Sequence, residues 1–255
     1  MGVPLCSSAA VRGRLSVYRE FAPRPELAGV VRCTWEGVPG WSRMLRVLPD
    51  GCVDLAWNGE RLFVTTGFGP LRVPLAADGR SVGLRLRCGV AGGLLGAAPV
   101  TDLVPAGALE AAVSPAEQRV VLERFVARRL RDGFRPDPAL PAVVRELAIP
   151  GARVDLAADR LGLSERTLRR RLRAATGCGP KEVQRTLRFS GFVRRIGELA
   201  TGRASLSTVA AELGYADQSH LGHECARLSG SSPARLVAGY ARHAGVAGIH
   251  QTTLS

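Results

Sequence analysis

The feature that most constrains this 255-residue chain is a short motif that occurs twice in its C-terminal half. ADRLG at residues 158–162 is matched by AAELG at residues 210–214, and a turn, a helical pattern and a proline follow each copy. In both copies a leucine of the second helix precedes the closing proline by twelve positions, as in Leu168 and Pro180, Leu221 and Pro233. Because the spacing is kept, the chain contains two copies of one helical unit.

Each unit has the residues that a helix-turn-helix requires. These are a small residue where the helices cross, a glycine that can adopt positive φ at the turn, and an N-cap for the second helix. They are Ala158, Gly162 and Ser164 in copy one, and Ala210, Gly214 and Asp217 in copy two. We therefore predict second helices over residues 164–175 and 217–228, joined by a long helix over residues 180–202.

The second helix of copy one has a strongly cationic face. Leu161, Leu168 and Leu172 recur at helical spacing and are expected to face inward. The side chains left for the outer face and its flanks are Glu165, Arg166, Arg169, Arg170 and Arg173. Eleven basic residues lie between Arg160 and Arg195 against two acids, in a chain of net charge +13. Such a face indicates double-stranded DNA as partner, because phosphates and guanine acceptors neutralise guanidinium groups; the alternative is a solvated helix surface.

These residues resemble the DNA-binding domain of AraC/XylS transcription regulators. The matching stretches are LAADRLGLSERTLRRRLRAATGCGPKEVQRTLR and LSTVAAELGYADQSHLGHECARLSGSSPARL, which contain the elements A-x-x-L-G-Y, D-Q-S-H and S-P. The resemblance implies that the two second helices enter successive major-groove segments. It also implies a bacterial regulator that activates transcription through contacts with RNA polymerase.

Carried over by position, the resemblance implies a set of DNA contacts. Base reading falls to Arg166, Arg169 and Arg170 in copy one, and to Gln218, Ser219 and His223 in copy two. Further contacts, phosphates among them, are expected from Arg173, Lys181 and Arg185. Family members usually have arginine where this chain has His223, and a polar residue where it has Gly222. We therefore expect copy one to provide most of the specificity and copy two mainly to position the protein.

The predicted fold class is α+β with more than one domain. Residues 1–133 alternate short apolar segments with Gly and Pro turns, which predicts a mainly antiparallel β domain, a barrel or a sandwich, that ends in a helix starting near Ser114. That helix would either join two subunits in a homodimer or cap its own domain. Residues 134–141, with three prolines, are the predicted linker. Residues 142–245 form the all-α double helix-turn-helix domain, and residues 246–255 form a tail.

The N-terminal part resembles a domain of uncharacterised function that often precedes AraC-type pairs, through RVLPDGCVDLAWNGERLFVTTGF and GLRLRCGVAGGLLGAAPVTDL. Aromatic walls with a few charged groups are typical of ligand pockets. The residues proposed to line an effector pocket are Trp35, Asp54, Trp57 and Arg85. The alternative is that Asp50-Gly51 forms a hairpin turn and that Asp54 bonds to nearby backbone.

Other functional classes lack support in the sequence. We find no catalytic spacing, no phosphate loop and no cofactor motif. His220, His223 and Cys225 lack a second ligand cluster, so no metal is expected, and the six scattered cysteines are interpreted as small buried hydrophobes. No apolar run is long enough for a membrane span, so we expect a cytoplasmic protein. The alternatives to a sequence-specific regulator are a non-specific nucleic-acid-binding protein and an enzyme fused to a DNA-binding module.

Overall fold

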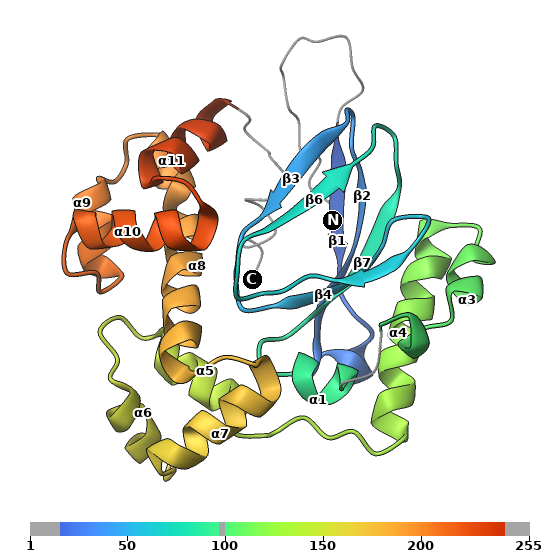
Figure 1. Ribbon diagram of the computed structural model, residues 1–255, viewed down its shortest axis with the longest axis horizontal. Coiled ribbons are helices and arrows are strands. Elements are labelled where there is room, and N and C mark those ends of the chain that lie inside the picture. Colours follow the sequence, from blue (N-terminus) through green and yellow to red (C-terminus); the bar gives the residue numbers. More distant parts are fainter. Residues whose placement is uncertain (1–15, 97–99, 243–255) are drawn as a thin grey trace.

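The structure is a computed structural model that describes residues 16–96 and 100–242. The predicted tail at residues 246–255 lies outside the described residues. A β domain, which runs to the end of α4, and a helical domain, which begins at α5, lie side by side (Figure 1). The strands are β1 Val17–Phe21, β2 Val31–Val38, β3 Arg43–Val47, β4 Val53–Trp57, β5 Leu62–Val64, β6 Leu71–Leu75 and β7 Ser81–Leu86.

The strands form two antiparallel sheets. One has five strands in the order β1-β2-β7-β4-β5, and the other is the pair β3-β6. The two sheets face each other as an open sandwich, and among the described residues no strand pairing closes them into a barrel. The α+β class with an antiparallel N-terminal domain is thus confirmed, and of the two predicted architectures the sandwich is nearer.

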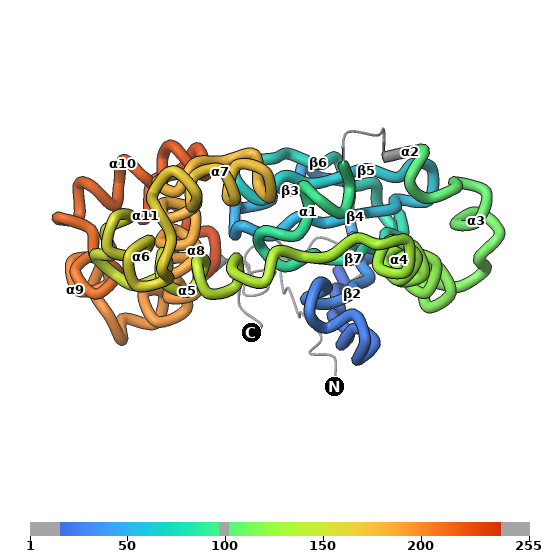
Figure 2. The backbone as a smooth tube through the Cα atoms, turned by 90° about the horizontal axis from the view of Figure 1, so that it is seen from below, coloured from blue at the N-terminus to red at the C-terminus, as the bar shows by residue number. Residues whose placement is uncertain are grey.

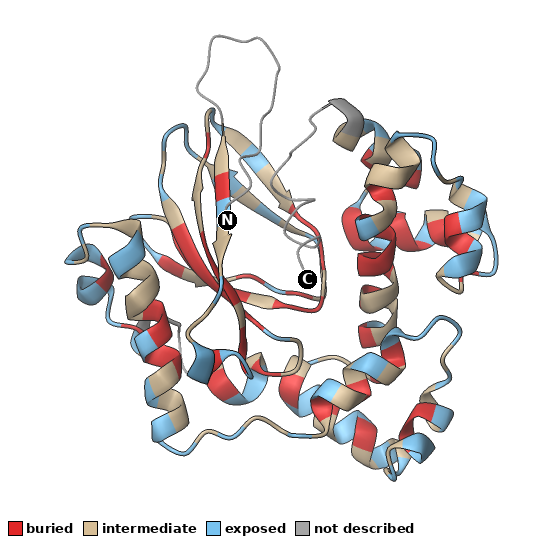
Figure 3. Cartoon of the chain, turned by 180° about the vertical axis from the view of Figure 1, so that it is seen from behind, coloured by how far each residue is buried: buried red, intermediate tan, exposed pale blue. Residues whose placement is uncertain are grey.

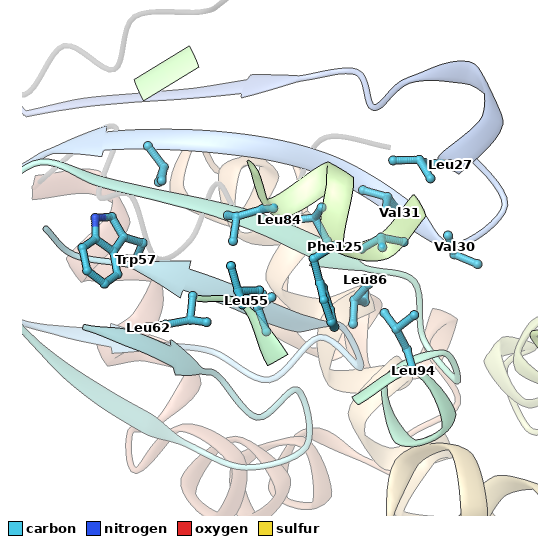
Figure 4. Packing of buried hydrophobic residues seen from close by; sticks show 14 of the residues in the cluster. Leu27, Val30, Val31, Leu55, Trp57, Leu62, Leu84, Leu86, Leu94 and Phe125 are labelled. Atoms are coloured by element: carbon cyan, nitrogen blue, oxygen red, sulfur yellow. The ribbon is translucent and has the colours of Figure 1, made fainter. Parts of the chain in front are cut away.

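Strand periodicity divides the five-stranded sheet into two unlike faces. Successive side chains of a strand point to opposite faces, so Leu55 and Trp57 of β4 pack in the main core while Ala56 packs with Trp35 on the other face. Figure 4 shows the main core, in which Leu55, Leu84 and Leu86 lie against Phe125 of α4. The second face is turned toward the β3-β6 pair.

Helix α4, Pro115–Arg131, covers the main core and caps its own domain. Its start is a capping box in which the Glu117 N–H donates to Ser114 Oγ (3.2 Å) and Ser114 N–H donates to the Glu117 carboxylate (3.0 Å). Leu122, Phe125 and Val126 are buried against the sheet, as the buried stripe of the helix in Figure 3 shows. Its solvent face carries exposed Arg124, Arg128 and Arg131. Within this chain, α4 therefore caps its own domain.

The expectation that the N-terminal domain consists of strands and turns up to the helix near Ser114 is wrong after β7. Three short helices follow that strand: α1 Ala91–Leu95, α2 Val100–Leu103 and α3 Ala106–Glu110. Short apolar runs do not distinguish a strand from a buried helix segment. Here tertiary packing favours the helical conformation, because Leu94 of α1 and Leu109 of α3 fill the main core. Gly92 also brings α1 so near α7 that a Cβ there would lie 2.3 Å from the Ala174 carbonyl oxygen.

The helical domain, as far as the structure describes it, contains seven helices. They are α5 Leu140–Ala148, α6 Val154–Arg160, α7 Glu165–Thr176, α8 Pro180–Ala200, α9 Leu206–Glu212, α10 Gln218–Ser229 and α11 Pro233–Arg242. The long helix α8 joins a lower group, α5 to α7, to an upper group, α9 to α11 (Figure 1). None of the described helices is both long enough and apolar enough to pass through a bilayer.

The two domains share apolar cores. Leu48 of the β domain belongs to the cluster around Phe189 and Phe192 of α8, and Phe68 packs on the core of copy one. The segment predicted as linker has irregular structure over residues 134–137 and enters α5 at Leu140. The positions of the two reading units relative to the β domain are therefore set by side-chain packing as well as by the linker.

Candidate nucleic-acid interface

Both turns have the predicted helix-turn-helix geometry. Gly162 and Gly214 have φ values of 64° and 75°, a conformation that costs other residues strain. Ala158 and Ala210 are buried where the helices cross. Gly214 has a second role, since a Cβ there would lie 2.6 Å from the backbone nitrogen of Gly151. The turn of copy two is therefore pressed against the loop that precedes α6 in copy one.

The predicted N-caps begin both second helices. Ser164 Oγ accepts the Thr167 N–H at 3.2 Å at the start of α7, and Asp217 Oδ1 accepts the His220 N–H at 2.7 Å at the start of α10. Each cap satisfies a backbone donor that has no partner within its own helix. In Figure 2 both α7 and α10 lie along the same edge of the helical domain. The two helices expected to read DNA therefore lie on the same side of the helical domain.

The outer face of α7 is the arginine face that its sequence predicts. Leu168, Leu172 and Ala175 are buried, so the opposite positions are left in solvent. The exposed side chains are Arg166, Arg169, Arg170 and Arg173. Together with Glu165 they line an open groove on the protein surface.

The protein's own acids neutralise little of this face. Arg169 Nε lies 3.0 Å from Glu165 Oε1, an exposed pair across one helical turn. Exposed pairs of this kind are worth a few tenths of a kcal/mol, roughly 0.3–0.5, so DNA can replace them. Within residues 16–96 and 100–242, the guanidinium groups of Arg166, Arg170 and Arg173 form no ion pair. Three cations on one helical face are therefore left for an external anion.

Copy two offers a more weakly charged surface. Gln218, Ser219 and His223 are exposed on the first turns of α10. His220 is turned inward, where its Nδ1 accepts the Ala216 N–H at 3.3 Å and its ring lies edge-on to Tyr215 at 5.4 Å. Cys225 is fully buried in the core of copy two. None of the three exposed side chains on the first turns of α10 carries a guanidinium group.

The predicted contacts on α8 fall into two environments. Lys181 is exposed. Arg185 is half-buried, and its Nε lies 3.7 Å from Oε1 of Glu224 on α10. Arg188 Nη2 lies 4.0 Å from the other Glu224 oxygen, while its guanidinium carbon is 4.7 Å from the Tyr215 ring centroid. Arg185 therefore already has an acidic partner within the protein, Glu224, and the sequence did not predict this ion pair.

Glu224 is the functional residue that sequence reasoning missed. It is 7% exposed and ties α10 to the long helix through Arg185 and Arg188. A signal was present, because Leu221, Glu224, Cys225 and Leu228 follow the spacing of an inward helical face. An acid in such a stripe indicates a buried ion pair.

The four proposed effector residues do not share one site. Arg85 and Asp54 form a buried cross-strand pair, with Arg85 Nε 2.8 Å from Asp54 Oδ1 and Nη2 2.9 Å from Oδ2. Glu20 lies 3.6 Å from the same guanidinium group. Trp35 lines the space beside this pair, and its Nε1 has no hydrogen-bond partner among the described residues. Trp57 lies in the main core, because it is three positions from Asp54 in one strand and so faces the opposite side.

The space between the two sheets is small. It is lined mainly by apolar side chains of both sheets together with Trp35, Asp54 and Arg43, and its free volume is about 70 Å³. Pockets for small molecules usually measure roughly 300–1,000 Å³. This space has room for a few waters and is too small for a typical metabolite.

The alternative interpretation of Asp50 and Asp54 is wrong in part. Gly51 has a φ of 82°, and Asp50 Oδ1 accepts the Cys52 N–H at 2.8 Å, so the predicted turn is present. It is not a hairpin, because β3 pairs with β6 while β4 pairs with β5 and β7. The Asp54 carboxylate bonds to Arg85 rather than to nearby backbone.

Three of the five described cysteines are small buried side chains, as predicted, whereas Cys88 and Cys178 are only partly buried. Cys33, Cys52 and Cys225 are buried, and burial raises the pKa of each thiol to about 12. Burial also raises the pKa of half-buried Cys88 to about 12. At neutral pH these thiols stay protonated, which is the unreactive form. Cys6 lies outside the described residues.

Comparison with known proteins agrees with this geometry. Residues 157–238 match the helix-turn-helix domain family, and residues 19–106 match a domain of unknown function, DUF6597. No curated protein is similar enough to this chain to count as a relative. Together, the two capped reading helices and the matched helix-turn-helix family define a DNA-binding transcription regulator.

Residues 157–238 therefore form a helix-turn-helix domain of the AraC type, the type that the sequence resembles.

Two solved structures are similar to this chain at low sequence identity. Fatty acid-bound ToxT from Vibrio cholerae strain SCE256 is similar at 12% identity with a TM-score of 0.41, over 90% of this chain and 96% of that one. ToxT from Vibrio cholerae O395 is similar at 13% identity with a TM-score of 0.37, over 78% and 89%. These scores are too low to bear on the function of this chain.

Proposed function

We propose that the protein is a sequence-specific activator that reads two successive major-groove segments with residues 164–175 and 217–228. Arg166, Arg169 and Arg170 contact bases in the first segment, and Gln218, Ser219 and His223 contact the second. Arg173, Lys181 and Arg185 are assigned to phosphates. The observation that carries the proposal is the row of exposed arginines on α7, three of which have no acidic partner in the part of the chain that the structure describes.

The proposal further gives the β domain a sensory role in the cytoplasm, with RNA polymerase as the protein partner at promoters. Packing supports coupling between sensor and reader, because α1 touches the C-terminal end of α7 through Gly92 and Leu48 enters the core around α8. The solvent face of α4 is cationic, so a homodimer would need another surface. We keep residues 134–141 as the linker between the two functional parts.

The central experiment measures binding of the purified chain to genomic fragments and to scrambled duplex at one salt concentration. Specific regulators prefer their sites by a factor of about 10³–10⁷. We expect a preference in that range for promoter fragments. A ratio near one would identify a non-specific nucleic-acid-binding protein and would remove the proposed function.

Lys181 and Arg185 should contribute differently to the salt dependence of DNA binding. The slope of log affinity against log salt falls by about one unit for each phosphate that the protein no longer neutralises. We expect Lys181→Ala to flatten the slope by about one unit and Arg185→Ala by clearly less, because Glu224 already lies beside Arg185. Fluorescence anisotropy across a salt series measures both. Equal changes would mean that Arg185 leaves Glu224 when DNA binds.

A further inference from the structure

A cleft between the two domains is larger than the space inside the β domain. Its volume is about 420 Å³, which falls within the range of small-molecule pockets. It is lined by the β2–β4 side of the β domain, by the segment at residues 136–138, and by α5 and α8. We call it the arginine cleft, after Arg32, Arg87, Arg145 and Arg194 in its lining.

The four arginines come from both domains. Arg32 lies in β2 and Arg87 follows β7, whereas Arg145 lies in α5 and Arg194 in α8. The cleft is therefore complete only while the helical domain is docked on the β domain. A ligand held by both sets would stabilise the docked arrangement, because it binds that arrangement better than any other.

The lining of the cleft contains two acids, Asp50 and Asp137, beside the four arginines. Asp137 is turned to Arg171, whose Nη1 lies 3.2 Å from it, and it also accepts the Ala139 N–H at 2.9 Å. Asp50 is the other acid of the lining, and burial raises the pKa of its carboxyl above the usual value. Burial therefore disfavours the ionised form of the Asp50 carboxyl.

Two of the arginines repel each other across the domain boundary. Burial, and then the charge of Arg32, lower the pKa of Arg194, while Asp50 opposes the shift. Arg194 donates to Ser190 Oγ at 3.1 Å, which is a neutral partner. Arg87 donates to a neutral partner too, the Ala28 carbonyl oxygen at 2.7 Å. Neutral acceptors satisfy donors but leave the positive charge in place.

We propose that the arginine cleft binds a small anion with two or more oxyanion groups, such as a phosphate ester or a polycarboxylate. Guanidinium groups bind phosphate and carboxylate through paired N–H donors, and four of them converge on a volume that suits a metabolite. The anion bridges Arg32 and Arg87 to Arg145 and Arg194, and so holds α1 against the end of α7. This regulatory role rests on the proposed function, whereas anion binding itself does not.

DNA phosphate is the other anion that such a cluster of arginines could bind. The cleft shares Asp137 and Leu140 with a neighbouring pocket that is also lined by Arg170 and Arg171 of α7. In Figure 2, the segment that leads into α5 crosses the molecule between α4 and the helical domain. The test therefore includes competition with duplex DNA.

The test uses the full chain without DNA and three probes: pyrophosphate, citrate and fructose 1,6-bisphosphate. Isothermal titration at constant ionic strength should detect binding of at least one probe at submillimolar concentration. Arg32→Gln and Arg194→Gln should each weaken it by tenfold or more. The matched control is Arg124→Gln, an exposed arginine of α4 outside the cleft, which should bind the probe as the unmodified chain does.

A second measurement reports on the domain boundary. Trypsin should cleave after Arg131, the exposed last residue of α4 beside the segment that joins the two domains, and the bound probe should slow that cleavage severalfold. Protection should be absent in Arg194→Gln. Circular dichroism establishes that each variant is folded before it is compared.

Three results would overturn the proposal: no probe binds at millimolar concentration, the Arg124→Gln control loses binding equally, or random duplex displaces the probe in competition. The last would assign the cleft to DNA phosphates. Arg166→Gln separates this inference from the proposed function, because it should weaken DNA binding and leave the probe affinity unchanged. If promoter preference is absent while the probe binds, the proposed function fails and the anion site stands.

Discussion

Replacing Asp54 by alanine is expected to destabilise the protein by about 3–5 kcal/mol, because it leaves the charge of Arg85 buried without its main counter-ion. The side chains of Arg85 and Asp54 are only 3% and 6% exposed, and two short hydrogen bonds join them across β7 and β4. Glu20 is a poor substitute for Asp54 as counter-ion, because its carboxylate lies 3.6 Å from the Arg85 guanidinium group. Urea denaturation followed by circular dichroism measures the change.

The control for this experiment removes both charges. A double variant, Asp54→Leu with Arg85→Met, should be far more stable than Asp54→Ala, since apolar replacements of buried ion pairs are often neutral or stabilising. A loss below about 1 kcal/mol for Asp54→Ala would mean that water reaches the guanidinium group. The pair would then be a surface feature and not part of the core.

Replacing Arg170 by alanine is expected to cost about 1–3 kcal/mol of binding free energy on the cognate site and much less on random duplex. Arg170 is exposed on α7 and, unlike Arg169, has no acid beside it among the described residues. It is therefore free to donate to the edge of a guanine, the commonest specific arginine contact. Anisotropy titrations on both duplexes measure the difference.

His223→Ala is the matched variant in copy two. When the two copies are aligned on Leu168 and Leu221, His223 occupies the position equivalent to Arg170. We expect it to cost less than Arg170→Ala, because an imidazole ring has two nitrogens for hydrogen bonds to a base whereas a guanidinium group has five N–H donors. A larger loss from His223→Ala would reverse our assignment of specificity to copy one. An equal loss from Arg170→Ala on cognate and random duplex would assign Arg170 to a phosphate.

Much of the reading unit could be predicted from the sequence because its determinants are local. The N-caps Ser164 and Asp217 act within one helical turn, and Gly162 and Gly214 act on their own backbone. Inward leucines at helical spacing then set which arginines are exposed. The β domain was less predictable, because the apolar segment at residues 91–95 suits a strand and a helix equally well.

The sequence by itself determined the repeat, the helix boundaries and the cationic face of α7, since these depend on residues within a few positions of one another. Only the tertiary structure decided which charges remain available. It paired Arg85 with Asp54 and placed Glu224 beside Arg185, and it separated Trp57 from Trp35 by a sheet. The physical reason is that ion pairs, cavities and the docking of two domains join residues far apart in the chain, and packing selects them.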